Sequence, residues 1–131
     1  MITTSDIGDI IYSKCASLGI QRYHQDAFPS EEIEGERIVI IVKDQTDGML
    51  WEKCFVEVNV CVPDHQRLQD RKRLGELQRE VKELFREEVA GSFDNTTFRY
   101  KRNSFGVHSD ASLRIHFINT RLLFESQKVI T

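Results

Sequence analysis

The sequence predicts an α+β, two-layer domain, in which a mainly antiparallel sheet carries two helices packed on one face. First, the spacing of apolar residues changes along the chain in the order helix, strand, strand, helix, strand, strand. Second, short turn-forming segments join the expected strands in pairs, as in hairpins. Third, 131 residues of ordinary globular composition, 40% hydrophobic and 30% charged, suffice for one core of two layers. We therefore expect a single domain over residues 1–131.

A first helix is expected between Thr3 or Thr4, either of which can cap it, and Gly19, which can end it. Apolar residues recur between them at helical spacing, at Ile7, Ile10, Ile11, Cys15 and Leu18. The following residues, 19–36, have no clear period. Their run "FPSEEIEGE" concentrates carboxylates that repel one another, so we expect an exposed acidic loop.

Two strands should follow and pair as an antiparallel hairpin. "RIVIIVK", residues 37–43, holds five β-branched residues between two cations, which indicates a central strand covered on both faces. A turn at Asp44, Asp47 and Gly48 leads into "WEKCFVEVNVCVP", residues 51–63. One face of this second strand should be core, formed by Cys54, Val56, Val58, Val60 and Val62. The other face is mixed, with Trp51, Phe55 and Cys61 beside Lys53, Glu57 and Asn59.

A long helix is expected next. Pro63 ends the strand, Asp64 is placed to cap the helix, and Gly91 is placed to close it. Apolar residues step by three and four between them, at Leu74, Leu77, Val81, Leu84, Phe85 and Val89.

The last third of the chain alternates again and predicts a second hairpin. Its strands are "FRYKR", residues 98–102, and "SLRIHFI", residues 112–118, separated by Gly106 and the "HSDA" turn. Leu113, Ile115 and Phe117 share one face of the second strand. "RLLFE", residues 121–125, either extends that strand or leaves it as an arm.

Targeting signals and membrane spans are not expected. The longest apolar run, "IVIIV", is far shorter than the ~20 residues of a membrane helix. The N-terminal stretch lacks a basic region and carries two aspartates where a signal peptide would be apolar. The three cysteines have no metal-binding spacing, so we interpret them as reduced thiols of a cytoplasmic protein.

Catalytic and metal chemistry find little support in the residue pattern. Cys54 and Cys61 point to opposite faces of one strand and cannot share a metal. His65 follows the expected helix cap, where a histidine is usually exposed. His108, Asp110 and His116 could gather across the second hairpin, but His116 points to the other face and nothing fixes a third ligand nearby. This favours exposed hairpin histidines over a metal site. A glycine-flanked serine and a phosphate-cradling glycine loop are both missing. We expect no enzyme activity, no cofactor and no metal.

Charge also argues against a specific nucleic-acid binder. The net charge is −3, with 12 acidic and 5 basic residues in 1–65 (−7) and 9 acidic and 13 basic in 66–131 (+4). "TFRYKRNSF", residues 97–105, interleaves aromatics with cations. A strand with Phe98 and Tyr100 inward and Arg99 and Lys101 outward explains this better than base stacking. A small nucleic-acid-binding module, or another non-catalytic protein-interaction module, remains the alternative function.

The element order resembles a known family on four features. These are the short N-terminal helix and acidic loop, "RIVIIVK" leading into "WEKCFVEVNVCVP", the long helix, and the closing "SLRIHFINTRLLFE". The chain is similar in these to the tail-terminator or tail-completion proteins of long-tailed bacteriophages and related prophages. The resemblance implies a non-enzymatic structural protein that forms a homo-oligomer, typically a ring of six. Such a ring sits at the head-proximal end of the tail tube in the virion, where it stops tube growth and contacts tube and neck proteins.

The resemblance also indicates where contacts with other subunits or partners should lie. The expected segments are the acidic loop 28–36, the turn 44–50 and the hairpin 103–111. The charge split between the two halves is consistent with neighbouring copies that meet through different faces, and equally with attraction between the halves of one monomer. The residues we expect to form such contacts are Glu31, Glu32, Glu34, Trp51, Phe55, Arg99, Lys101, Arg102 and Phe105.

Overall fold

The first helix begins and ends where its sequence predicts. In the computed structural model, which describes residues 1–27, 35–66 and 68–128, α1 spans Thr4–Lys14. The Thr3 hydroxyl accepts a hydrogen bond from the Asp6 amide, and the Asp6 carboxylate accepts one from the Thr3 amide at 2.9 Å, which forms a capping box. A 3₁₀ turn, η1 (Cys15–Leu18), continues the helix to Gly19, whose φ of 69° ends it.

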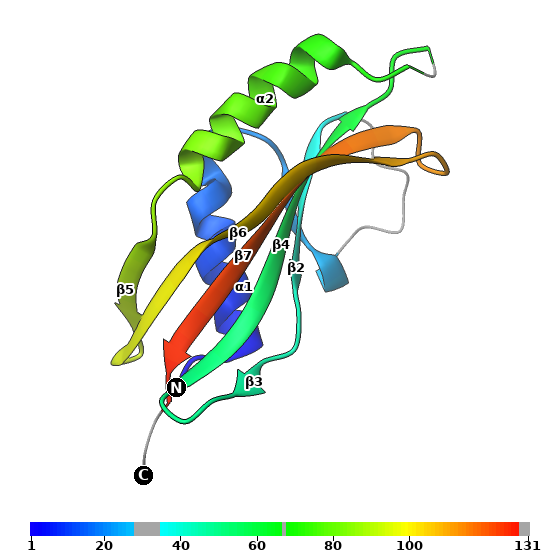
Figure 1. Cartoon of the computed structure of the whole chain (residues 1–131). Coiled ribbons are helices and arrows are strands. Elements are labelled where there is room, and N and C mark those ends of the chain that lie inside the picture. The colour runs from blue at the N-terminus through cyan, green and yellow to red at the C-terminus, as the bar shows by residue number, and fades with distance from the viewer. Residues whose placement is uncertain (28–34, 67, 129–131) are drawn as a thin grey trace.

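Within the described residues, seven strands form one twisted sheet in the order β1-β2-β4-β7-β6-β5, with β3 paired to β4 (Figure 1). Every pairing is antiparallel except that of β1 with β2. The strands are β1 (Arg22–His24), β2 (Arg37–Val42), β3 (Thr46–Asp47), β4 (Trp51–Pro63), β5 (Val89–Phe93), β6 (Thr96–Asp110) and β7 (Ile115–Gln127). A short 3₁₀ helix, η2 (Gln25–Ala27), follows β1. The mixed α+β class and the mostly antiparallel sheet are confirmed, whereas β1, β3 and β5 were not expected.

The first predicted hairpin is confirmed in register. Ile40 pairs with Val58, and β2 lies inside the sheet between β1 and β4. The expected core face of β4 is buried at every position, from Cys54 to Val62. β1 lies within the segment 19–36, for which no element was expected, and residues 28–34 of the expected acidic loop lie outside the described residues.

The limits predicted for the second helix were wrong. α2 spans Arg71–Leu84 and is capped by Asp70, whose carboxylate accepts a hydrogen bond from the Arg73 amide at 3.2 Å. The helix cannot start at Asp64 because a tight turn intervenes, in which His65 pairs with Leu68 and Gln66 adopts a φ of 51°. At the other end, Val89 and Gly91 belong to β5, where they pair with Tyr100 and Phe98 of β6.

The second hairpin is longer than expected and turns later. β6 continues through Gly106, which pairs with Asn119, so Gly106 and residues 108–110 of "HSDA" belong to the strand, and only Ala111 lies in the turn. The turn instead lies at 111–114, where one carboxylate oxygen of Asp110 accepts hydrogen bonds from the Ser112 and Leu113 amides at 3.1 and 3.2 Å. "RLLFE" extends β7 rather than forming an arm.

A β-bulge divides β6 into two segments. Arg102 pairs with Leu122 and Ser104 pairs with Arg121, so Asn103 is an extra residue without a partner in β7. Because side chains alternate along a strand, the extra residue reverses the alternation in the second segment. Phe105 therefore shares a sheet face with Phe98 and Tyr100, although the spacing in the sequence places it on the opposite face.

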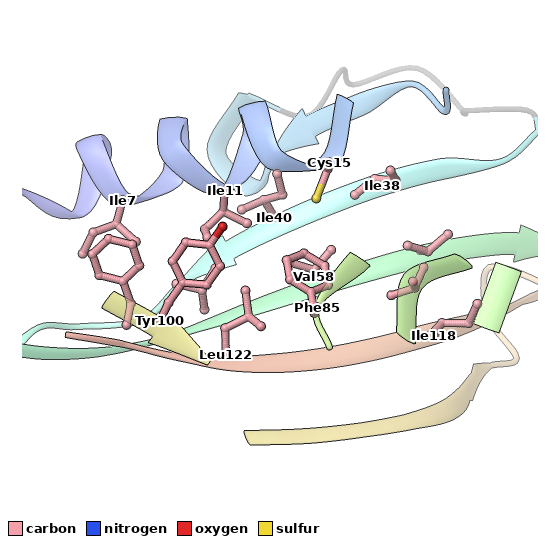
Figure 2. Packing of buried hydrophobic residues seen from close by; sticks show 14 of the residues in the cluster. Ile7, Ile11, Cys15, Ile38, Ile40, Val58, Phe85, Tyr100, Ile118 and Leu122 are labelled. Carbon is pink, nitrogen blue, oxygen red and sulfur yellow. The ribbon is translucent and has the colours of Figure 1, made fainter. Parts of the chain in front are cut away.

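Both helices contribute to one hydrophobic core (Figure 2). Ile7 and Ile11 of α1 and Leu77 and Val81 of α2 are fully buried in it. The sheet contributes even-numbered residues of β4 and β7 to this core, including Val56, Val58, Val60, Ile118, Leu122 and Phe124. We call this side of the sheet the inner face and the opposite side the outer face.

The described helices are all too short or too polar to cross a membrane.

Candidate interaction surfaces

The outer face carries the odd-numbered residues of β4 and β7, which point away from the core that α1 and α2 share. The expectation that Leu113, Ile115 and Phe117 share one face of a strand is confirmed for Ile115 and Phe117 and wrong for Leu113. Ile115 and Phe117 lie on the outer face, and Leu113 is exposed in the turn. The outer face is therefore both aromatic and charged, as the mixed pattern of 51–63 predicts.

Trp51 lies at one end of the outer face beneath a cation. The guanidinium carbon of Arg99 is 4.0 Å from the centre of the Trp51 ring, which is a cation–π contact. Glu125, the cross-strand neighbour of Arg99, accepts from the Arg99 Nε at 3.4 Å. This ion pair holds the guanidinium over the ring.

Phe55 repeats the arrangement further along β4. The guanidinium carbon of Arg121 is 3.9 Å from the centre of the Phe55 ring. Glu57, next to Arg121 across the strands, forms an ion pair with Lys43 at 3.5 Å. The outer face thus holds two aromatic rings, each stacked under an arginine and surrounded by side chains that form ion pairs. Aromatic and arginine side chains of this kind are enriched in protein interfaces.

A hollow of about 230 Å³ lies at the opposite end of the outer face from Trp51. Its apolar lining comes from Val39, Cys61, Ile115, Phe117 and Leu113, with Arg37, Asn59 and Asp110 as polar members. The Asn119 side-chain amide donates to the Asn59 side-chain carbonyl at 2.7 Å, which fixes one wall. Burial raises the pKa of the Cys61 thiol to about 11, so this cysteine is not an activated nucleophile.

The histidines expected at the second hairpin do not gather. His116 Nδ1 lies 2.6 Å from an Asp64 carboxylate oxygen, and the His108 ring stacks on Phe117 with ring centres 5.6 Å apart. Among the residues that the structure describes, no three His, Cys, Asp or Glu side chains come together as metal ligands.

The nine predicted contact residues fall into three groups. Glu31, Glu32 and Glu34 lie outside the described residues. Trp51, Phe55, Arg99 and Lys101 all lie on the outer face. Arg102 and Phe105 lie on the inner side of the sheet, where Arg102 donates a hydrogen bond to the Lys82 carbonyl at 3.2 Å.

Sequence reasoning missed the partners of the two aromatic rings. Arg121 and Glu125 reach Phe55 and Arg99 only because β7 pairs with both β4 and β6 in one register. The alternation of "RLLFE" would have placed both residues on the same face as each other. It could not have placed them beside particular residues of other strands.

Neither a protein-family model nor a curated protein matches this chain. Solved structures do share its fold. One of them aligns with 98% of this chain and 96% of its own, with a TM-score of 0.62 and 12% sequence identity. Identity at this level establishes the similarity of the fold alone.

Proposed function

We propose that this chain is a structural subunit without a catalytic role, which assembles with copies of itself through the outer face of the sheet. The observation that carries this proposal is the composition of that face. Trp51 and Phe55 are only half-buried there, each held under an arginine, and the apolar hollow beside Cys61 lies on the same surface. Fixed aromatic and arginine side chains of this kind are typical anchors of protein interfaces.

The resemblance in element order makes this proposal more specific. By that resemblance the chain is a two-layer subunit of a tail-terminator or tail-completion ring, incorporated into the tail of a virion. The ring would contact tube and neck proteins. The turn before β4 supports contacts beyond the sheet, because Met49 and Leu50 are 92% and 63% exposed there. A ring needs two different surfaces on each subunit, and this turn and the hollow lie at opposite ends of β4.

The nucleic-acid alternative receives less support from the geometry. Base stacking requires open aromatic faces, whereas arginines already lie 4.0 and 3.9 Å from the Trp51 and Phe55 ring centres. Arg99 is also paired with Glu125, which reduces its value for a phosphate.

Light scattering coupled to size-exclusion chromatography tests the proposal over a range of protein and salt concentrations. We expect a discrete oligomer that binds purified tail-tube protein. A protein that stays monomeric at high concentration and low salt, and does not bind tube protein, would overturn it.

A further inference from the structure

A second surface, separate from the outer face, lies along the open edge of β6. β5 pairs with β6 only up to Tyr100, so the segment 101–110 has β7 on one side. On its other side, no strand of the described chain pairs with it. Alternate N–H and C=O groups of such an edge point outward unpaired, which makes it a template for an added strand.

A groove flanks this edge, with residues of α2 on one wall and Phe105 of β6 on the other. The groove measures about 260 Å³ and is lined by Gly75, Gln78, Arg79 and Lys82 of α2 together with Phe105 of β6. The hydrogen bond from Arg102 to the Lys82 carbonyl ties the two walls together. Phe105 reaches the groove because the bulge at Asn103 turns it to the inner side.

The groove is rich in unpaired positive charge. Lys82 Nζ and the Arg102 guanidinium carbon lie 5.8 and 5.7 Å from the centre of the Phe105 ring, and Arg79 lines the same wall. In the described part of the chain, none of these three cations forms an ion pair with a carboxylate. Two carboxylates of α2 are engaged elsewhere, since Glu76 pairs with Arg73 and Glu83 pairs with Arg86.

We propose that an extended, acidic segment of another protein binds in this groove as an additional strand on the 101–110 edge of β6. Backbone hydrogen bonds to the edge supply the affinity, as in other cases of strand addition between an edge and a helix. Carboxylates of the segment meet Arg79, Lys82 and Arg102, and an apolar side chain rests on Phe105. The open edge favours a peptide over a polynucleotide, because only a peptide backbone matches its donors and acceptors.

A fluorescently labelled peptide of alternating glutamate and valine, as long as the open edge, is the probe. We expect binding to the intact chain that weakens as salt is added. We also expect slowed hydrogen exchange at alternate backbone amides of 101–110. The matched peptide with lysine in place of glutamate should not bind.

Two charge-reversal variants distinguish peptide binding in the groove from nonspecific electrostatic attraction to the protein. Arg79→Glu combined with Lys82→Glu should weaken peptide binding at least about tenfold. Arg71→Glu combined with Lys72→Glu changes the same net charge on exposed positions of the same helix outside the groove, and should weaken binding much less. Equal thermal midpoints of both variants would verify that each is folded.

Four results would overturn the inference. They are the absence of peptide binding at low salt, equal binding of the lysine peptide, binding without protection of 101–110, and tighter binding of a single-stranded DNA oligonucleotide. The test is independent of subunit assembly, because Trp51→Ala alters the outer face and should leave peptide binding unchanged.

Discussion

At the scale of single residues, the three cysteines lie in different elements, but each has a thiol whose pKa is raised by burial. Burial raises the pKa of Cys15 to about 12 and the pKa values of Cys54 and Cys61 to about 11. The Cys54 thiol also donates to the Lys43 carbonyl at 3.0 Å. These are structural thiols, as the valine-rich context of Cys54 predicts.

We expect none of the three thiols to react rapidly with a disulfide reagent in the native protein. At about pH 8, a thiol with a pKa of about 11 rather than 9.0 holds roughly a hundredth of the thiolate. Spectrophotometric thiol titration before and after addition of denaturant measures this. Fast labelling of a native thiol would show that its burial is transient.

Asp110 offers a residue-scale prediction about pH. Its pKa is lowered by the hydrogen bond from the Ser112 side chain and then by the Leu113 amide. A lowered folded-state pKa means that the stabilisation of the turn is present above the ordinary carboxyl value of 3.8 and is lost as the pH falls through the lowered value.

The Ser112 and Leu113 amide NMR signals should therefore titrate with a midpoint below 3.8. Asp110→Asn should abolish that step and leave other carboxylates unaffected. A midpoint at or above the ordinary value would contradict the hydrogen bonds on which the prediction rests.

At the scale of elements, strand alternation and helical spacing predicted a helix or strand correctly wherever the local pattern of apolar residues fitted only one type of element. α1, β2 and β4 follow their sequences closely. α2 could not be delimited, because the turn at Gln66 and the pairing of Val89 with Tyr100 depend on partners distant in sequence. The short strands β1 and β3 carry too few residues to show a period.

Two glycines give opposite predictions for the elements that contain them. A Cβ on Gly91 of β5 would lie 2.7 Å from Phe98 Cζ, so Gly91→Ala should destabilise the protein by about 1–3 kcal/mol. A Cβ on Gly75 of α2 meets nothing nearer than Arg79 Nη1 at 4.0 Å, so Gly75→Ala should stabilise it by roughly 0.5–1 kcal/mol. Urea unfolding of both variants measures the difference, and equal stabilities would contradict the packing of Phe98 against β5.

At the scale of the whole molecule, the sequence identified the mixed face of β4 as a surface but not its extent. Trp51, Phe55 and Cys61 were visible in one strand. Arg121, Phe117 and the hollow required the order of the sheet, which brings β7 between β4 and β6. The acidic residues 31, 32 and 34 remain a prediction.

Trp51→Ala should weaken assembly more than it weakens folding. Removing an aromatic anchor from an interface raises a subunit dissociation constant by about tenfold or more. Phe93→Ala is the matched control, because Phe93 is 39% exposed on the edge strand β5, away from Trp51. Sedimentation velocity of the two variants measures assembly, and an unchanged oligomer in Trp51→Ala would refute the role of this residue.

Because of the bulge at Asn103, side chains alternate between the two faces of the sheet in opposite senses in the two segments of β6. Before it, odd-numbered residues such as Arg99 face the outer side. After it, even-numbered residues such as His108 do, as the stacking of His108 on Phe117 illustrates. Deleting this single residue would remove the bulge and leave Ser104 opposite Arg121 and Phe105 opposite Thr120, so the tip of the hairpin would keep its faces on a regular strand. An alignment with a relative that lacks one residue here should therefore place its gap at 103, because a gap elsewhere in β6 would align residues of the groove with residues of the outer surface.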